Sequence, residues 1–177
     1  MHNIEFKAEL RDLALARQIA ISIGAKYTDT VEQTDTYYRL ADGRLKRREA
    51  RRASAEKGVA QEVDIEVIHY HRVNTAAIRP SRFNVYTAEQ ASERFGATPG
   101  PVWVVVTKLR EVYLYEGVRV HLDQVLNLGT FIEFEAPVRP EQAVSTCREI
   151  VQRLRDAFRP AMGEPISTSY SDLLAEE

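Results

Sequence analysis

The sequence predicts an α+β protein whose centre is an antiparallel β-barrel of about eight strands, flanked by helices. Segments with the period-two alternation of strands outnumber helical segments. Short turns such as Ala41-Asp42-Gly43 and Glu116-Gly117 join neighbouring strands, as antiparallel pairing requires. The strands do not alternate regularly with helices, so the sequence does not indicate a parallel sheet. We expect a single domain over residues 1–177.

The elements of the first half follow from alternation and from turn residues. Residues 3–10 alternate as a strand, and residues 12–23 place apolar side chains at helical spacing before Gly24. Strands are expected at 33–40, 44–52, 63–73 and 82–86, with a polar loop at 54–61 and a short helix at 88–95.

The second half holds the strongest strand patterns. After a break at 98–101, strands are expected at 102–115, 118–125 and 130–138. Pro140 opens a helix over 141–158 that ends before Pro160, and the tail STSYSDLLAEE forms a short cap.

Composition limits the classes of partner. The net charge of −2 gives no reason to expect attraction of the whole molecule to nucleic acid or to anionic lipid. One cysteine, Cys147, excludes a disulfide framework and a cysteine-rich zinc site. The chain has no apolar run of membrane-spanning length and its start is no signal peptide, so we expect a cytoplasmic protein without membrane contact.

Ionisable residues occupy alternate positions on nearly every expected strand, and side chains two apart share a face. Basic residues on these faces are Arg44, Lys46, Arg48, Arg72, Lys108, Arg110 and Arg119; acidic ones are Glu5, Asp123, Glu133 and Glu135. Charged faces of this kind are commonly the solvent-exposed side of an antiparallel sheet. Here the basic residues gather on some strands while the carboxylates gather near the first and last, which favours a charged lumen enclosed by the barrel.

A lumen of this kind suits a polyanion that carries a divalent metal. Arginine and lysine grip phosphate oxygens, and carboxylates hold Mg²⁺ or Mn²⁺. A glycine-rich phosphate loop is missing from the sequence, so side chains would have to hold the phosphate.

Six segments resemble one family in the right order along the chain. They are NIEFKAEL, QTDTYYRLADGRLKRRE, the Tyr-x-Arg of 70–72, the Lys-x-Arg of 108–110, VRVHLDQVLNLGTFIEFEA and SYSDLL. Together they resemble the CYTH superfamily of triphosphate tunnel metalloenzymes, in particular its class IV adenylyl cyclase-like branch. The resemblance implies an eight-stranded antiparallel tunnel that binds a triphosphate with a divalent metal.

The resemblance also implies roles for individual residues. Glu5, Asp123, Glu133 and Glu135 are expected on the metal side, and Arg44, Lys46, Arg48, Arg72, Lys108, Arg110 and Arg119 in the phosphate-binding wall. Lys7 and Glu5 are the expected catalytic residues, with Lys7 placed to help activate water. The first motif has Asn3 where the family carries an acid, which should weaken metal binding.

The predicted function is a Mg²⁺- or Mn²⁺-dependent enzyme that converts ATP to cAMP and pyrophosphate. Hydrolysis of tripolyphosphate or thiamine triphosphate in the same lumen is the first alternative, and a binding protein for nucleotides or polyphosphate without turnover is the second. Nucleic acid is the least favoured partner, because aromatic residues do not interleave with the basic ones. Whether the chain forms a homodimer is left open.

His69 and His71 lie on the face opposite to Tyr70 and Arg72, and we expect a packed or solvent-facing pair rather than metal ligands. His121 shares the inferred lumen face and could meet phosphate, a base or a carboxylate. Arg82 is a weaker candidate for a phosphate contact.

Overall fold

The structure, a computed structural model, describes residues 1–53 and 62–175, so the loop expected at 54–61 lies outside the described residues. The strands are β1 (His2–Leu10), β2 (Lys26–Tyr38), β3 (Arg44–Arg52), β4 (Asp64–Arg72), β5 (Arg79–Tyr86), β6 (Val102–Tyr115), β7 (Val118–Val125), β8 (Gly129–Pro137) and β9 (Met162–Pro165). The helices are α1 (Leu13–Ser22), α2 (Ala88–Phe95), α3 (Val144–Phe158) and α4 (Tyr170–Ala175), with a 3₁₀ turn at Arg159–Ala161.

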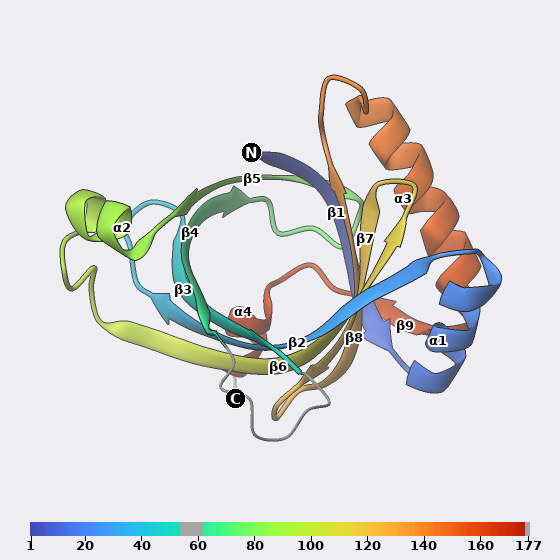
Figure 1. The fold of residues 1–177 in the computed structure, drawn as a ribbon, viewed down its shortest axis with the longest axis horizontal. Helices are drawn as coiled ribbons and strands as arrows, with labels where there is room; N and C mark the ends of the chain where they lie inside the picture. Colours follow the sequence, from blue (N-terminus) through green and yellow to red (C-terminus); the bar gives the residue numbers. More distant parts are fainter. Residues whose placement is uncertain (54–61, 176–177) are drawn as a thin grey trace.

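Eight antiparallel strands close into a barrel in the order β5-β4-β3-β2-β6-β7-β8-β1, and pairing of β1 with β5 completes the ring (Figure 1). The first half of β1 pairs with β5 over His2–Glu5, while Ala8 and Leu10 pair with the short strand β9. The predicted fold class is therefore confirmed, with β9 as an additional strand.

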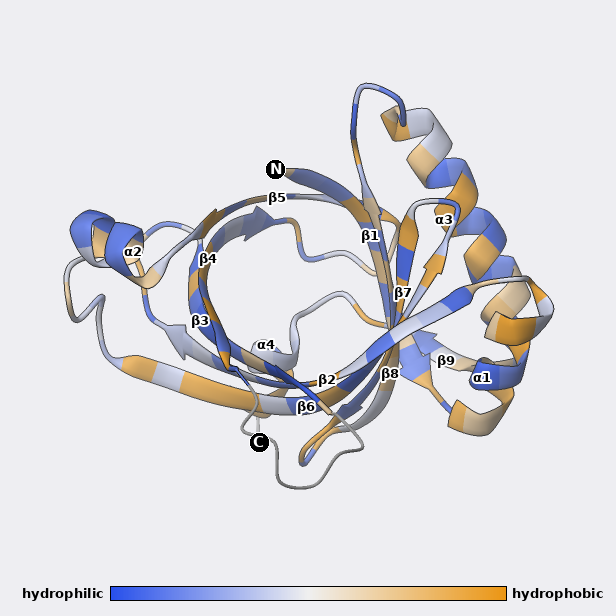
Figure 2. Ribbon diagram, viewed as in Figure 1, coloured by the Kyte–Doolittle hydropathy of each residue, from blue (hydrophilic) through white to orange (hydrophobic). Residues whose placement is uncertain are grey.

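The main hydrophobic core lies outside the barrel. Strands β1, β7 and β8 alternate between hydrophilic and hydrophobic residues (Figure 2), and their outward apolar side chains pack against α1 and α3. The buried outward residues of these strands include Ile4, Phe6, Val120, Leu122, Ile132 and Phe134. Because apolar burial occupies the outer face, the polar face of each of these strands turns inward.

Four elements differ from the sequence prediction, and one of them is β5, which begins at Arg79 instead of residue 82. Strand β2 begins at Lys26 instead of residue 33, because it pairs with the long strand β6 from Lys26 to Tyr38 although its first residues do not alternate. Helix α3 begins at Val144 instead of 141, because Arg139 and Gln142 form a bridged turn. Strand β9 was not predicted, because its four residues acquire strand geometry only through β1.

None of the helices in the described part of the chain is long and apolar enough to cross a membrane.

We predict that Phe134→Ala lowers the free energy of unfolding by about 3–5 kcal/mol, because the ring is 0% exposed and packs between Phe6 and Phe158. Val105→Ala is the control, because Val105 lies on β6 with 48% of its surface exposed and should cost about 0.5 kcal/mol or less. Denaturant unfolding measures both. Equal losses in the two variants would contradict a core located outside the barrel.

Candidate functional site

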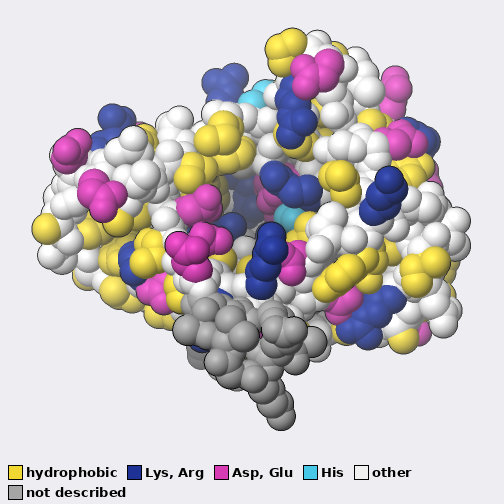
Figure 3. Space-filling view, viewed as in Figure 1, with side chains coloured by type: hydrophobic (Ala, Val, Ile, Leu, Met, Phe, Trp, Pro, Cys, Tyr) yellow, Lys and Arg dark blue, Asp and Glu magenta, His cyan; other side chains and the backbone are white. Residues whose placement is uncertain are grey.

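The inward faces of the strands enclose a cavity of about 680 Å³. Figure 3 shows a hollow at the centre of one face, with basic, acidic and histidine side chains on its walls and floor. Ten predicted site residues line the cavity: Glu5, Lys7, Lys46, Arg48, Arg72, Lys108, Arg110, Arg119, Glu133 and Glu135. These charged faces point into the barrel. The alternative, a sheet whose charged face is exposed to bulk solvent, is therefore wrong for these residues.

One wall of the lumen is cationic and is organised around Asp35, which sequence reasoning missed. Asp35 lies on β2, is 1% exposed and accepts two hydrogen bonds from Arg48, at 2.7 and 2.8 Å. Lys46 Nζ donates to the same carboxylate at 2.9 Å, and Lys108 Nζ lies 3.9 Å away. Burial alone would raise the pKa of Asp35, but the three cations outweigh it and hold the pKa well below its usual range.

The opposite wall holds a cluster of potential metal donors. One ligand atom from each of His121, Glu133 and Glu135 lies within 4.8 Å of the others. Burial, with Arg110 nearby, lowers the pKa of His121, so its imidazole is neutral near pH 7. Burial opposes ionisation of Glu133, but Lys7, His121 and Arg110 hold its pKa well below the usual range. The cluster therefore offers a neutral imidazole and ionised carboxylates.

One atom of this cluster supports its fit to a divalent cation. His121 Nδ1 is buried and has no hydrogen-bond partner among the described residues, and its separation from Glu133 Oε2 is 3.8 Å. A buried ring nitrogen without a partner is costly unless something else binds it. A cation between His121 and the two carboxylates would supply that partner.

Two other predicted metal ligands are already engaged by arginines. Glu5 Oε1 accepts hydrogen bonds from Arg72 and from Arg79, both at 3.0 Å. Asp123 is fully buried, accepts two bonds of 2.7 Å from Arg110, and does not line the cavity. These contacts orient the arginines, and a metal role for either carboxylate remains a prediction.

Lys7 lies between the donor cluster and the C-terminal helix. Its Nζ is 3.7 Å from Glu133 Oε1 and 3.8 Å from the ring centroid of Tyr170. Burial lowers the pKa of Lys7 to about 8, although Glu133 partly opposes the shift. The ammonium group of Lys7 can therefore release a proton, and the amine can take one up, near neutral pH.

The C-terminal segment closes one end of the lumen. Tyr170, at the start of α4, donates a hydrogen bond of 2.8 Å to Asp123 and packs on Phe131 with ring centroids 4.9 Å apart. Val106 and Val125 complete this apolar plug. The sequence indicated a cap at the tail, but it did not show that Tyr170 enters the barrel, because a single tyrosine in a polar tail carries no periodic signal.

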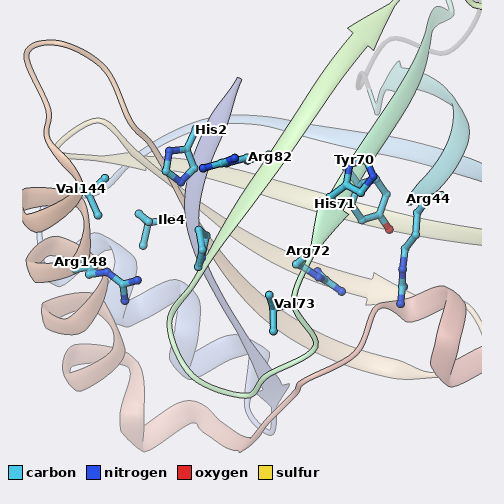
Figure 4. A pocket seen from close by; sticks show the side chains of 12 residues that line it. His2, Ile4, Arg44, Tyr70, His71, Arg72, Val73, Arg82, Val144 and Arg148 are labelled. Atoms are coloured by element: carbon cyan, nitrogen blue, oxygen red, sulfur yellow. The ribbon is translucent and has the colours of Figure 1, made fainter.

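Arg44, another predicted phosphate ligand, is held by the C-terminal segment, and its phosphate role remains a prediction. It donates to Ser169 at 2.6 Å and to Asp172 at 2.7 Å, and it does not line the lumen. It lines a second cavity of about 660 Å³ (Figure 4), together with Arg82. The two cavities share His2, Tyr70 and Arg72, so this second cavity adjoins the lumen.

Arg79 was also missed by sequence reasoning. It is 1% exposed and donates from Nε to Glu5 and from Nη1 to the carbonyl of Ile166, at 3.0 Å each. It follows a segment without clear alternation, and the strand was expected to begin only at residue 82. The position of Arg79 at the seam between β1 and β5 explains its burial.

Comparisons with known proteins agree with this geometry. A family model described as CYTH domain matches residues 1–170. No curated protein matches the chain.

Solved structures share the fold at low sequence identity. The PH1012 protein from Pyrococcus horikoshii OT3 is 19% identical, with a TM-score of 0.67 over 97% of this chain and 98% of that one. A Vibrio parahaemolyticus protein provisionally assigned as an adenylate cyclase is 14% identical, with a TM-score of 0.65 over 99% and 98%. The S. pombe Pct1 RNA triphosphatase is 13% identical, with a TM-score of 0.56 over 95% and 87%.

We predict that Asp35→Asn lowers the free energy of unfolding by about 3–5 kcal/mol, because it removes the carboxylate that compensates three buried or half-buried cations. The pKa of Asp35 is lower in the folded chain than its ordinary value of 3.8, so its contribution is present above that pH and is lost as the pH falls toward the folded-state pKa. Stability should thus depend less on pH below about pH 4 in the variant.

The matched control is Asp29→Asn on the same strand. Asp29 pairs at 2.7 Å with Arg52, whose side chain is 81% exposed, so its loss should cost about 1 kcal/mol or less. Denaturant unfolding across a pH series measures both variants. A loss no larger for Asp35 than for Asp29 would show that Asp35 does not organise the wall.

Proposed function

The chain belongs to the CYTH domain family, and we propose that it is an enzyme that binds a triphosphate in the barrel lumen with the help of a divalent cation. The observation that carries this proposal is the pairing of two walls across one cavity. Lys46, Arg48 and Lys108 form the cationic wall, and the cluster of His121, Glu133 and Glu135 faces the same space.

The charge of the lumen matches a metal-bound triphosphate. Eight lysine and arginine side chains and four glutamates line the cavity, and Asp35 and Asp123 lie behind them. The lining therefore has an excess of positive charge that these two carboxylates reduce but do not cancel. A triphosphate with one divalent cation keeps a negative charge, which this excess would neutralise.

Mg²⁺ or Mn²⁺ is the cation that the donor set favours, because carboxylate oxygens outnumber the single imidazole. His121, Glu133 and Glu135 would hold it, and the bound cation would neutralise charge on the phosphate oxygens. Asn3 also lines the cavity and is buried. The position at which the family carries an acid therefore lies in the lumen, where this chain has an uncharged amide.

The chain's own residues have separable tasks in this proposal. Arg48 and Lys46 bind phosphate oxygens in place of Asp35, whose carboxylate holds them in position in the absence of ligand. Lys7 holds or releases a proton at Nζ beside the reacting group, for which a pKa of about 8 is well matched. Tyr170 and its apolar neighbours keep water from entering at the closed end.

The reaction that we favour is cyclisation of ATP to cAMP with release of pyrophosphate. The 3′-oxygen of the ribose bonds to the α-phosphorus, the bond from that phosphorus to the bridging oxygen breaks, and the hydroxyl proton passes to a base such as Lys7. The segments that resemble the class IV cyclase branch support this choice. Hydrolysis of tripolyphosphate or thiamine triphosphate is the alternative, since the same grip on the triphosphate would serve both reactions.

We predict that the purified protein releases cAMP and pyrophosphate from ATP in the presence of Mg²⁺ or Mn²⁺. The assay compares ATP, tripolyphosphate and thiamine triphosphate, and it quantifies cAMP, pyrophosphate and phosphate. Release of phosphate without cAMP would show that the protein is a hydrolase. Binding of a triphosphate without any product would show that it is a binding protein. Asn3→Glu should raise activity at limiting metal if the missing acid weakens metal binding.

We predict that Lys46→Met weakens tripolyphosphate binding by about 1.5–3 kcal/mol, because a charged hydrogen bond to phosphate is lost. The fold should persist, since Arg48 and Lys108 remain near Asp35. Arg51→Met is the control on the same strand, because Arg51 points away from the cavity and lies 3.5 Å from Glu32 with 60% of its side chain exposed. Calorimetric titration measures both; unchanged affinity in Lys46→Met would remove Lys46 from the binding wall.

A further inference from the structure

Three potential metal ligands meet on the outside of the barrel, away from the lumen. Asp42 lies in the turn between β2 and β3, and His69 and His71 lie on β4. One ligand atom from each residue lies within 4.8 Å of the other two. The alternation of β4 sends Tyr70 and Arg72 into the lumen and turns both histidines outward.

The two imidazoles converge on the same turn. His69 Nε2 donates a hydrogen bond of 3.0 Å to the carbonyl oxygen of Asp42, and His71 Nε2 donates one of 3.0 Å to Asp42 Oδ1. The ring centroids are 4.9 Å apart. Both Nε2 atoms therefore face the turn instead of diverging into solvent.

Gly43 makes this convergence possible. Its φ of +70° belongs to the left-handed region that favours glycine. A Cβ at this position would lie 2.7 Å from His69 Nε2 and 2.8 Å from His71 Nε2, closer than real contacts allow. The absence of a side chain at Gly43 leaves the two ring nitrogens next to one open position.

We propose that Asp42, His69 and His71 form a second metal site, selective for a borderline divalent transition metal such as Zn²⁺. Two imidazole nitrogens and one carboxylate are a donor set that Zn²⁺ accepts, with water in its fourth position. The lumen cluster has one imidazole and two carboxylates and is suited to harder cations. The two sites therefore differ in the metal that they prefer.

Coordination through Nε2 requires a change of tautomer in each neutral ring. In the absence of metal both Nε2 atoms carry hydrogen, because each donates to an oxygen of Asp42. A metal takes the Nε2 lone pair, so each ring moves its proton to Nδ1. The metal replaces two hydrogen bonds with coordination bonds between the turn and β4.

The position of the site gives the metal a structural role. The turn connects two strands of the cationic wall, and His69 also packs against Phe95 of α2 with ring centroids 5.5 Å apart. Coordination would join the turn, β4 and α2 at one point. The side chains of His71 and Asp42 are 52% and 86% exposed, so the metal can enter from solvent.

Histidine-selective ¹⁵N NMR tests the proposal directly, because the chain has four histidines and hence four ring systems to assign. Zn²⁺ is titrated into the full chain in millimolar Mg²⁺, which occupies carboxylate-rich sites. We expect the rings of His69 and His71 to change from the Nε2–H to the Nδ1–H tautomer together, at a stoichiometry of one Zn²⁺ per chain.

The variants His69→Ala/His71→Ala and, more conservatively, His71→Gln should each lose this equivalent of Zn²⁺. Tripolyphosphate binding should be unchanged in His71→Gln, which separates this site from the lumen. His121→Ala is the control and should leave the response of His69 and His71 intact. The proposal is overturned if Zn²⁺ shifts only His121 or His2, if no histidine responds, or if His71→Gln retains the full Zn²⁺ stoichiometry.

Discussion

Compensation of buried charge is the constraint on which the rest of this structure depends. Many charged side chains are buried in and behind the cavity wall, and an unpaired ion there would cost several kcal/mol. Internal carboxylates form ion pairs with these cations: Asp35 with Lys46 and Arg48, Asp123 with Arg110, and Glu5 with Arg72 and Arg79. The basic residues are thus held in fixed positions before any ligand arrives, which is the form of preorganisation that electrostatic catalysis needs.

The outer packing makes the two walls unequal. Helices α1 and α3 cover β1, β7 and β8, and these strands carry His121, Glu133 and Glu135 on their other face. Strand β3, which carries Lys46 and Arg48 of the cationic wall, contributes Leu45 to a small outer cluster with Val67 of β4 and Ala91 of α2. The donor cluster is therefore built on the best-packed part of the molecule, where a metal site benefits most from rigid support.

The sequence predicted the barrel and most of the lumen because both depend on a local rule. Alternation in β3 and β8 was enough to place Lys46 and Glu133 on inward faces. Asp35, Arg79 and Tyr170 could not be found in this way. Asp35 lies in a polar strand that also carries Asp29 and Glu32, so no local pattern distinguishes it. Arg79 and Tyr170 reach the site through contacts between segments far apart in the chain. Partners across the barrel depend on strand register and closure, which a single sequence does not display.

The divided edge of β1 has a consequence for how this chain acquires its structure. Residues 2–10 leave the ribosome before the strands that flank them, which are β5 and β9 on one side and β8 on the other. Pairing between such distant segments makes closure slow. Strand β1 therefore gains β8, β9 and α3 as partners only after most of the chain has been synthesised.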